Sequence, residues 1–139
     1  MTTETEIYTL HRYFIWANKM RTDFYAILGK RGPGKPVAPK EQIDLFLYMS
    51  LWYSQIYVVI ESWREIGLID KSIDSLLTSP NVDLLRRYRN GVCHFQKDYY
   101  DERFQGFMKD GEDSVQWVRY LNSEFGRWFF EHFKNNKNA

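Results

Sequence analysis

The sequence predicts an all-α fold, an antiparallel bundle of four main helices plus a short helix. Apolar residues recur three and four positions apart along nearly the whole chain, which is the spacing of one face of an α-helix. No stretch alternates apolar and polar side chains as a half-buried strand would, and no internal repeat appears. The 139 residues are expected to form a single domain, 1–139, with its own hydrophobic core.

The first helix is predicted over residues 7–28, and a loop follows it. Thr3 and Glu6 stand just before this helix with the spacing of a capping box, in which each side chain binds the other residue's backbone N–H. The stretch 29–40, GKRGPGKPVAPK, is rich in glycine and proline and is therefore predicted to be a basic linker. The apolar stripe of the first helix consists of Leu10, Tyr13, Ala17, Met20, Phe24 and Ile27.

A second helix is predicted from Pro39 to Ile66 as the central, buried helix of the bundle. Proline is tolerated in the first turn of a helix, and Gly67 is placed to end it. Its most apolar part, residues 45–60, is shorter than a membrane span and contains serine and glutamine. The acidic start, MTTETEIYTL, lacks the basic and apolar regions of a signal peptide. We therefore expect a soluble, cytoplasmic protein without membrane partners.

Three further helices are predicted, and one segment stays open. Residues 69–77 are expected to form a short helix, and Ser79–Pro80 to open a helix that reaches about Phe95. The stretch 97–111 is compatible with a continuation of that helix or with a loop. The tail 134–139 is expected to fray. A last helix is indicated by Val115, Val118, Leu121, Phe125, Phe129 and His132.

Composition narrows the possible functions. Aromatic residues make up 18% of the chain, more than one small core can cover, so some rings are expected to line a groove or a subunit contact. The formal charge of +1 argues against coating of nucleic acid through bulk charge but permits a local basic patch. Cys93 is the only cysteine, which excludes an internal disulfide and indicates a reducing compartment.

The sequence argues against three kinds of site: a phosphate-binding P-loop, a catalytic metal site and a cysteine nucleophile. Residues 29–35, GKRGPGK, match the start of a phosphate-binding P-loop, but Pro36 replaces the hydroxyl residue that binds magnesium. His94 and Asp98 are four apart, yet two ligands do not hold a catalytic metal. Cys93 points about 100° away from its neighbour His94 on a helix, so a buried or half-buried structural thiol is expected. No metal or cofactor is expected.

An arginine stands five residues before a histidine at two places, 89/94 and 127/132. On a helical wheel His132 falls on the core face and is expected to be a packing residue, whereas Arg127 points away. His94 falls on a polar stripe, for which a solvated basic face is the alternative interpretation. Gly91 lies mid-helix, where it costs about 1 kcal/mol relative to alanine, and this favours close approach of another backbone. The polar stripe comprises Arg86, Asn90, His94 and Lys97, and the opposite apolar face comprises Leu84, Leu85, Tyr88, Val92, Phe95 and Tyr99.

The residues RNGVCH at 89–94 resemble the R-N-x-x-x-H signature of the HEPN (higher eukaryotes and prokaryotes nucleotide-binding) superfamily. The order of VIESW (59–63), IDSLL (73–77) and LLRRYRNGVCHFQ (84–96) is similar to that of small bacterial HEPN proteins. The resemblance implies a HEPN-like bundle and a metal-independent endoribonuclease, a toxin or antiphage effector that acts as a homodimer with both motifs in one cleft. The catalytic residues that it implies are Arg89, Asn90 and His94.

The side chains agree with that chemistry. Neutral histidine can take the proton of a ribose 2′-hydroxyl near neutral pH. Arginine can bind two phosphate oxygens at once, and Asn90 can orient either the histidine or a phosphate oxygen. The expected products are a 2′,3′-cyclic phosphate and a 5′-hydroxyl end.

Further contacts are expected around this trio. Arg86, Arg87 and Lys97 are candidates for RNA binding. Glu61 is a candidate supporting carboxylate, with a surface or core-edge glutamate as the alternative. RNA is the expected substrate, and an antitoxin protein is a possible partner. A second interpretation is a HEPN-like dimer without catalysis that serves as a binding or assembly module.

Overall fold

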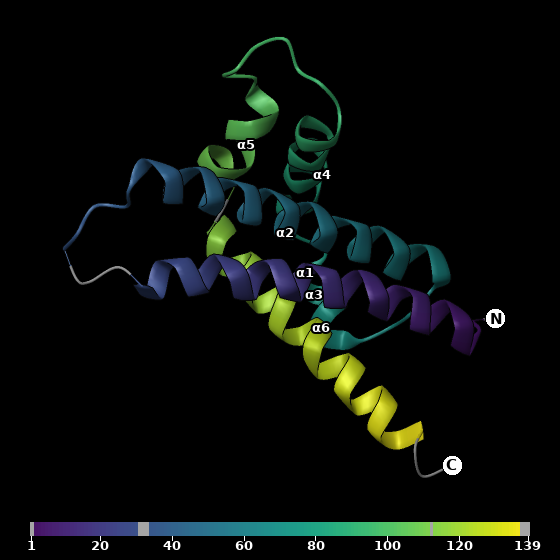
Figure 1. The fold of residues 1–139 in the computed structure, drawn as a ribbon. Coiled ribbons are helices and arrows are strands. Elements are labelled where there is room, and N and C mark those ends of the chain that lie inside the picture. Colours follow the sequence, from purple (N-terminus) through teal and green to yellow (C-terminus); the bar gives the residue numbers. More distant parts are fainter. Residues whose placement is uncertain (1, 31–33, 112, 137–139) are drawn as a thin grey trace.

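Six α-helices make up the computed structural model, which describes residues 2–30, 34–111 and 113–136 (Figure 1). The helices are α1 (Glu4–Lys30), α2 (Pro39–Ile66), α3 (Lys71–Leu76), α4 (Asn81–Cys93), α5 (Glu102–Asp110) and α6 (Ser114–Asn136). These ranges contain no strand. The predicted all-α helical bundle is therefore confirmed, and α5 is a second short helix beyond the one expected.

The long helices α1 and α2 pack against each other as an antiparallel pair (Figure 1). The start of α1 is held by the predicted capping box. Glu6 N–H donates to Thr3 Oγ1 at 3.1 Å, and Thr3 N–H donates to Glu6 Oε1 at 3.1 Å. These bonds satisfy amide groups that a helix N-terminus otherwise leaves without partners. The helix extends slightly beyond both predicted ends.

The predicted bounds of α2 are confirmed at both ends. Gly67 has a φ of 77°, in the left-handed region that glycine adopts without steric strain. Its N–H donates to Arg64 O at 3.2 Å, and Leu68 N–H donates to Trp63 O at 3.2 Å. The last carbonyls of the helix are thereby satisfied, so the chain turns where the sequence predicts.

α2 is also the central helix, since it packs against both α1 and α4. Within the described ranges α2 is the one helix long and apolar enough to cross a membrane, although core helices of soluble proteins pass the same test. Its amino-terminal third is less covered than the rest, and Ile43 is 72% exposed. The buried residues of α2 are Ser50, Trp52, Tyr53, Ser54, Ile56, Tyr57, Val59, Ile60 and Trp63.

Aromatic rings fill much of the space between α2 and α6. The Trp63 ring contacts Phe125 and Trp128, with centroid distances of 5.7 and 5.1 Å. Trp52, which is 1% exposed, donates its indole N–H to Asn122 Oδ1 at 3.2 Å. Such perpendicular ring contacts and a bonded indole are the usual arrangement for large buried aromatics. α6 is thereby tied to α2 through both apolar packing and a buried hydrogen bond.

The end of α4 differs from the prediction. The helix ends at Cys93, and His94 is extended with φ −124° and ψ 130°. Side chains in the following loop bind nearby backbone: Gln96 Nε2 donates to His94 O at 2.8 Å, and Tyr100 N–H donates to Asp98 Oδ1 at 2.9 Å. Local bonds of this kind compete with helical ones. The open stretch 97–111 therefore divides into a loop followed by α5.

Gly91 permits close packing, but its neighbour belongs to the same chain. A Cβ added at Gly91 would lie 2.9 Å from Arg103 Cβ and 3.5 Å from the Phe104 ring, both on α5. The close approach that was predicted at Gly91 is therefore found, and the approaching element is α5 of the same chain. α5 lies there because α4 and α5 fold back on each other (Figure 1).

Early termination of α4 also exposes side chains that the sequence placed elsewhere. Phe95 and Tyr99, expected on an apolar helix face, are 92% and 87% exposed because they lie in the loop. Cys93, expected to be buried or half-buried, is exposed. A helical wheel misplaces Phe95 and Tyr99 because it assumes a helix that continues past Cys93.

The linker and the tail agree only in part with expectation. Residues 29–30 belong to α1 and residues 39–40 to α2, so the predicted linker 29–40 is shorter than expected, and 31–33 lie outside the described residues. Residues 134–136 continue α6, so the predicted fraying of the tail is wrong there. The remaining part of that prediction, 137–139, lies outside the described residues.

Candidate functional site

Arg89 has three close neighbours, of which Tyr57 and Glu61 belong to α2 and Asn90 to its own helix. Its Nε donates to Asn90 Oδ1 at 3.1 Å, and its guanidinium carbon lies 4.8 Å from the centre of the Tyr57 ring. Its Nη2 is 4.0 Å from Glu61 Oε2, at the outer limit of an ion pair. The Arg89 side chain is 25% exposed, so part of its donor surface stays accessible. Glu61, which the sequence selected apart from the motif, thus lies beside Arg89.

Tyr57 is a member of this cluster that sequence reasoning missed. Burial raises the pKa of Tyr57, the nearby Glu61 carboxylate raises it further, and Arg89 and Arg86 lower it. The phenol therefore stays neutral near pH 7 and offers Arg89 the face of an aromatic ring. The available signal was the four-residue spacing of Tyr57 and Glu61 on a helix.

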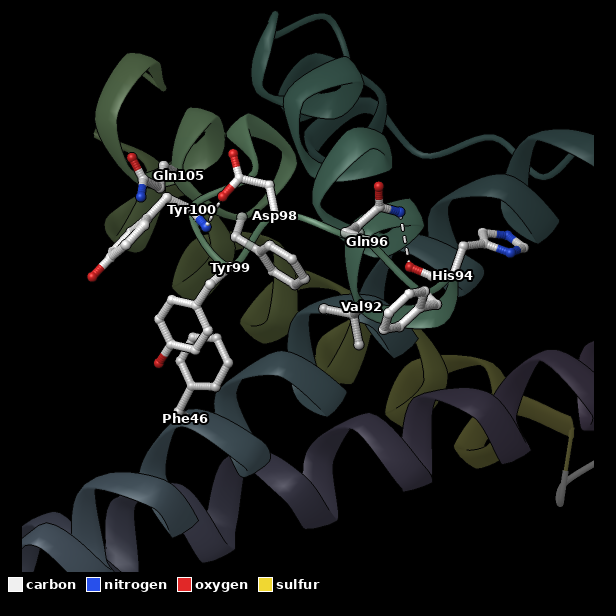
Figure 2. Close-up of a pocket in the computed structure, with 11 residues that line it drawn as sticks. Phe46, Val92, His94, Gln96, Asp98, Tyr99, Tyr100 and Gln105 are labelled. Carbon is white, nitrogen blue, oxygen red and sulfur yellow. Dashed lines mark hydrogen bonds between the residues drawn. The ribbon is translucent and has the colours of Figure 1, made fainter.

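His94 follows α4 directly and projects from its end. Its backbone N–H donates to Asn90 O at 3.0 Å, which is the last helical bond of α4. The residue is exposed, and in Figure 2 the imidazole points away from Tyr99 and Phe46. Within the described ranges its ring has no hydrogen-bond partner and makes no contact with Arg89. One chain thus presents Arg89 and His94 close in sequence but not in contact.

The predicted RNA-binding residues do not form one helical stripe. Arg86 binds Asp83 Oδ1 through Nε at 3.0 Å and Nη2 at 2.8 Å, which offsets its charge. Arg87 is exposed and has no ion pair in the part of the chain that the structure describes. Lys97 lies in the loop after α4 and is also exposed. The polar stripe breaks at the end of α4, and only Arg86 and Asn90 remain on the helix with Arg89.

A cavity of about 500 Å³ lies beside the end of α4 (Figure 2). We call it the aromatic cavity, because its lining includes Phe46, Phe95, Tyr99, Tyr100 and Phe104. The polar groups of Gln96, Asp98 and Gln105 stand among these rings. Such a volume and lining are typical of small-ligand pockets. The expectation that surplus aromatic residues line a groove is confirmed here.

The other arginine–histidine pair behaves differently. His132 stacks on Trp128, with ring centroids 5.0 Å apart and an interplanar angle of 8°. Its Nε2 lies 3.1 Å from Glu4 Oε1, so His132 packs α6 against α1 as expected. Arg127 binds acidic side chains: its Nη2 lies 2.7 Å from Asp70 Oδ2, and it also binds Glu124. The sequence did not indicate the pair with Asp70, because the two residues are 57 positions apart along the chain.

Metal-binding residues are not grouped in the described ranges, where no three His, Cys, Asp or Glu side chains are placed to hold one ion. The candidate site therefore consists of Arg89, Asn90, Tyr57 and Glu61 at the α2–α4 contact and His94 beyond it. These groups offer a fixed cation, an amide, a carboxylate and a titratable ring. No protein-family model, no curated protein and no solved structure matches this chain.

Proposed function

We propose that this protein is a metal-independent endoribonuclease of HEPN type. The observation that carries the proposal is the fixed position of Arg89, which is held by Asn90 and the Tyr57 ring and stands five residues before the exposed His94. A guanidinium held in place loses less conformational entropy when it binds phosphate. His94 is freely accessible to a substrate hydroxyl.

The reaction that fits these groups is an internal transfer at phosphorus. The ribose 2′-oxygen attacks the adjacent phosphorus while neutral His94 takes its proton. Arg89 binds two phosphate oxygens and offsets the charge that develops on them. The bond from phosphorus to the 5′-oxygen breaks, and that oxygen takes a proton from a second, protonated histidine. The products are a 2′,3′-cyclic phosphate and a 5′-hydroxyl end.

A homodimer is part of the proposal, because one chain leaves the set of groups incomplete. The imidazole of His94 has no partner in the described chain that orients it, and one histidine cannot be both base and acid in a single step. A second copy would supply both a second histidine and a second arginine. The exposed rings of Phe95 and Tyr99 stand close by and are suited to a contact between subunits.

RNA cleavage by purified protein in the presence of a chelator tests this function. We expect cyclic-phosphate products, a loss of about 10²- to 10⁴-fold in rate for His94→Ala, and a marked loss for Arg89→Lys. His132→Phe is the matched control, because it removes the other histidine of a five-residue pair yet keeps a ring on Trp128. Unchanged cleavage by His94→Ala would rule the mechanism out.

A dimeric binding or assembly module is the second candidate function. The specific observation in its favour is the aromatic cavity, where Tyr99 is 87% and Tyr100 71% exposed. The proposed cleavage reaction uses neither ring, whereas a binding surface for a partner would. The two functions differ in the cleavage assay. If the protein is such a module, neither the wild type nor His94→Ala cleaves RNA.

A further inference from the structure

A second cavity, of about 630 Å³, is lined by residues of α1 and α6 and by none of α4. Its lining residues are Arg21, Tyr25, Arg119, Asn122 and Ser123. Each of them carries at least one hydrogen-bond donor, and none of them is acidic. We call this feature the arginine cavity. A cavity with two positive charges, several further donors and no carboxylate in its lining is suited to an anion.

The two guanidinium groups are held in place by neutral partners. Arg21 Nε donates to Asn18 Oδ1 at 2.9 Å, and Arg119 Nε donates to Tyr25 Oη at 2.8 Å. The guanidinium carbon of Arg119 also lies 5.6 Å from the centre of the Tyr25 ring. Because each anchor uses Nε, the terminal nitrogens that form the fork toward an oxyanion stay available.

Neither arginine has a carboxylate partner in the part of the chain that the structure describes. Among the other described arginines, four have an acidic partner within 4.0 Å: Arg86, Arg89, Arg103 and Arg127. Two like charges that share one cavity repel each other, and an anion between them would reverse that effect.

A buried amide network fixes the floor of the arginine cavity. Asn122 is 7% exposed, and its Oδ1 accepts the indole N–H of Trp52 at 3.2 Å. That bond sets the orientation of the amide, whose Nδ2 then donates to Asn18 Oδ1 at 3.4 Å. Asn18 in turn holds Arg21, so the chain of bonds runs from the core to the guanidinium. Donors fixed in this way need little reorganisation when an anion binds.

We propose that the arginine cavity binds a phosphate group. Arginine forks match the oxygen pairs of a tetrahedral phosphate, and the Ser123 and Tyr25 hydroxyls can donate to the remaining oxygens. The group can belong to a free phosphorylated molecule or to the backbone of RNA, and both sources present the same oxygens. The inference does not depend on the proposed ribonuclease activity, because it uses none of the residues of that site.

Calorimetric titration of the full chain at low ionic strength tests the proposal. Inorganic pyrophosphate serves as the free ligand and a short single-stranded RNA as the backbone ligand, the latter with the His94→Ala protein so that no cleavage occurs. We expect saturable binding of at least one ligand, weakened about tenfold or more by Arg21→Ala and by Arg119→Ala, since a charge-assisted bond contributes on the order of 1.5–3 kcal/mol. Arg12→Ala, an exposed arginine of the same helix, is the control and should bind like the wild type.

The results distinguish a free phosphorylated ligand from the RNA backbone, and they show whether the proposal is wrong. Weakened pyrophosphate binding indicates a free phosphorylated ligand, whereas an effect confined to RNA indicates the nucleic-acid backbone. Melting curves without ligand check the fold of each variant, and Arg21→Lys replaces Arg21→Ala if the latter unfolds, because lysine keeps the charge but loses the fork. Absence of binding by both ligands would overturn the proposal, and so would an equal loss of affinity in Arg12→Ala.

Discussion

Arg127 on α6 binds Asp70 at the start of α3, with Nη2 2.7 Å from Oδ2. The same Asp70 oxygen accepts the backbone N–H of Ile73 at 3.1 Å and so caps α3. Arg127 also binds Glu124 and Glu131 on its own helix. One side chain therefore joins the cap of a short helix to the last helix of the bundle.

Removal of this link is expected to lower stability. Arg127→Ala should reduce the free energy of unfolding by about 1 kcal/mol, because partly exposed ion pairs contribute modestly and these form a network. Asp70→Ala should reduce it more, by about 1–2 kcal/mol, because the cap of α3 is lost as well. Urea denaturation measures both changes. Arg87→Ala is the control, because Arg87 is exposed and has no ion pair in the described chain. If Arg127→Ala lowers the free energy of unfolding no more than Arg87→Ala does, the prediction for Arg127 is contradicted.

Two glycines of the α4–α5 hairpin should respond in opposite directions to alanine. At Gly91 the new Cβ would lie 2.9 Å from Arg103 Cβ, so α4 and α5 must separate, at a cost of about 1–3 kcal/mol. At Gly106 the nearest atom would be 4.0 Å away, so Gly106→Ala should stabilise α5 by up to about 1 kcal/mol. Thermal melting of the two variants makes the comparison, and a Gly91→Ala protein as stable as the wild type would show that α5 does not pack there.

Acid should destabilise the fold through His11. Its ring lies against Phe129 and Phe133, with both centroid distances 4.8 Å, and burial lowers its pKa below the ordinary value of 6.5. The unfolded chain therefore binds a proton more readily than the folded chain. The contribution of neutral His11 to stability is complete above about pH 6.5 and is lost as the pH falls below that value.

Urea denaturation at about pH 7.5 and about pH 5.5 gives the free energy of unfolding at each pH, and the difference between the two values measures the effect. In His11→Phe the loss of stability on acidification should be smaller, because the ring stays and the titrating group is gone. The exposed His94 serves for comparison, and His94→Ala should lose as much stability as the wild type. An identical loss in His11→Phe would assign the acid sensitivity to other groups.

Self-association is expected to depend on the loop after α4. Sedimentation at micromolar concentration should report a dimer for the wild type. A double change, Phe95→Ser with Tyr99→Ser, should shift the equilibrium toward monomer, because rings that are 92% and 87% exposed can be buried only by another chain. Tyr120→Ser on α6, where the ring is 57% exposed, is the control. A wild-type protein that sediments as a monomer would remove the composite cleft from the proposed mechanism.

Local chemistry allowed the sequence by itself to determine the long helices. The Thr3–Glu6 capping box and the stop at Gly67 are interactions between residues within a few positions of each other, so they can be predicted without knowledge of the fold. The apolar spacing likewise indicates which helix is central. The choice of Arg89, Asn90 and His94 also came from the sequence, and their shared role stays a prediction.

Only the tertiary structure decided how the second half of the chain is arranged. α4 ends at Cys93 because loop side chains bind the backbone and α5 packs on Gly91, and neither contact is visible in the periodicity of α4. Glu61 meets Arg89, and Arg127 meets Asp70, across distances of 28 and 57 residues along the chain. Helical spacing reports which face a side chain occupies, whereas contacts between helices depend on how those helices cross, and that is set by packing of the whole core.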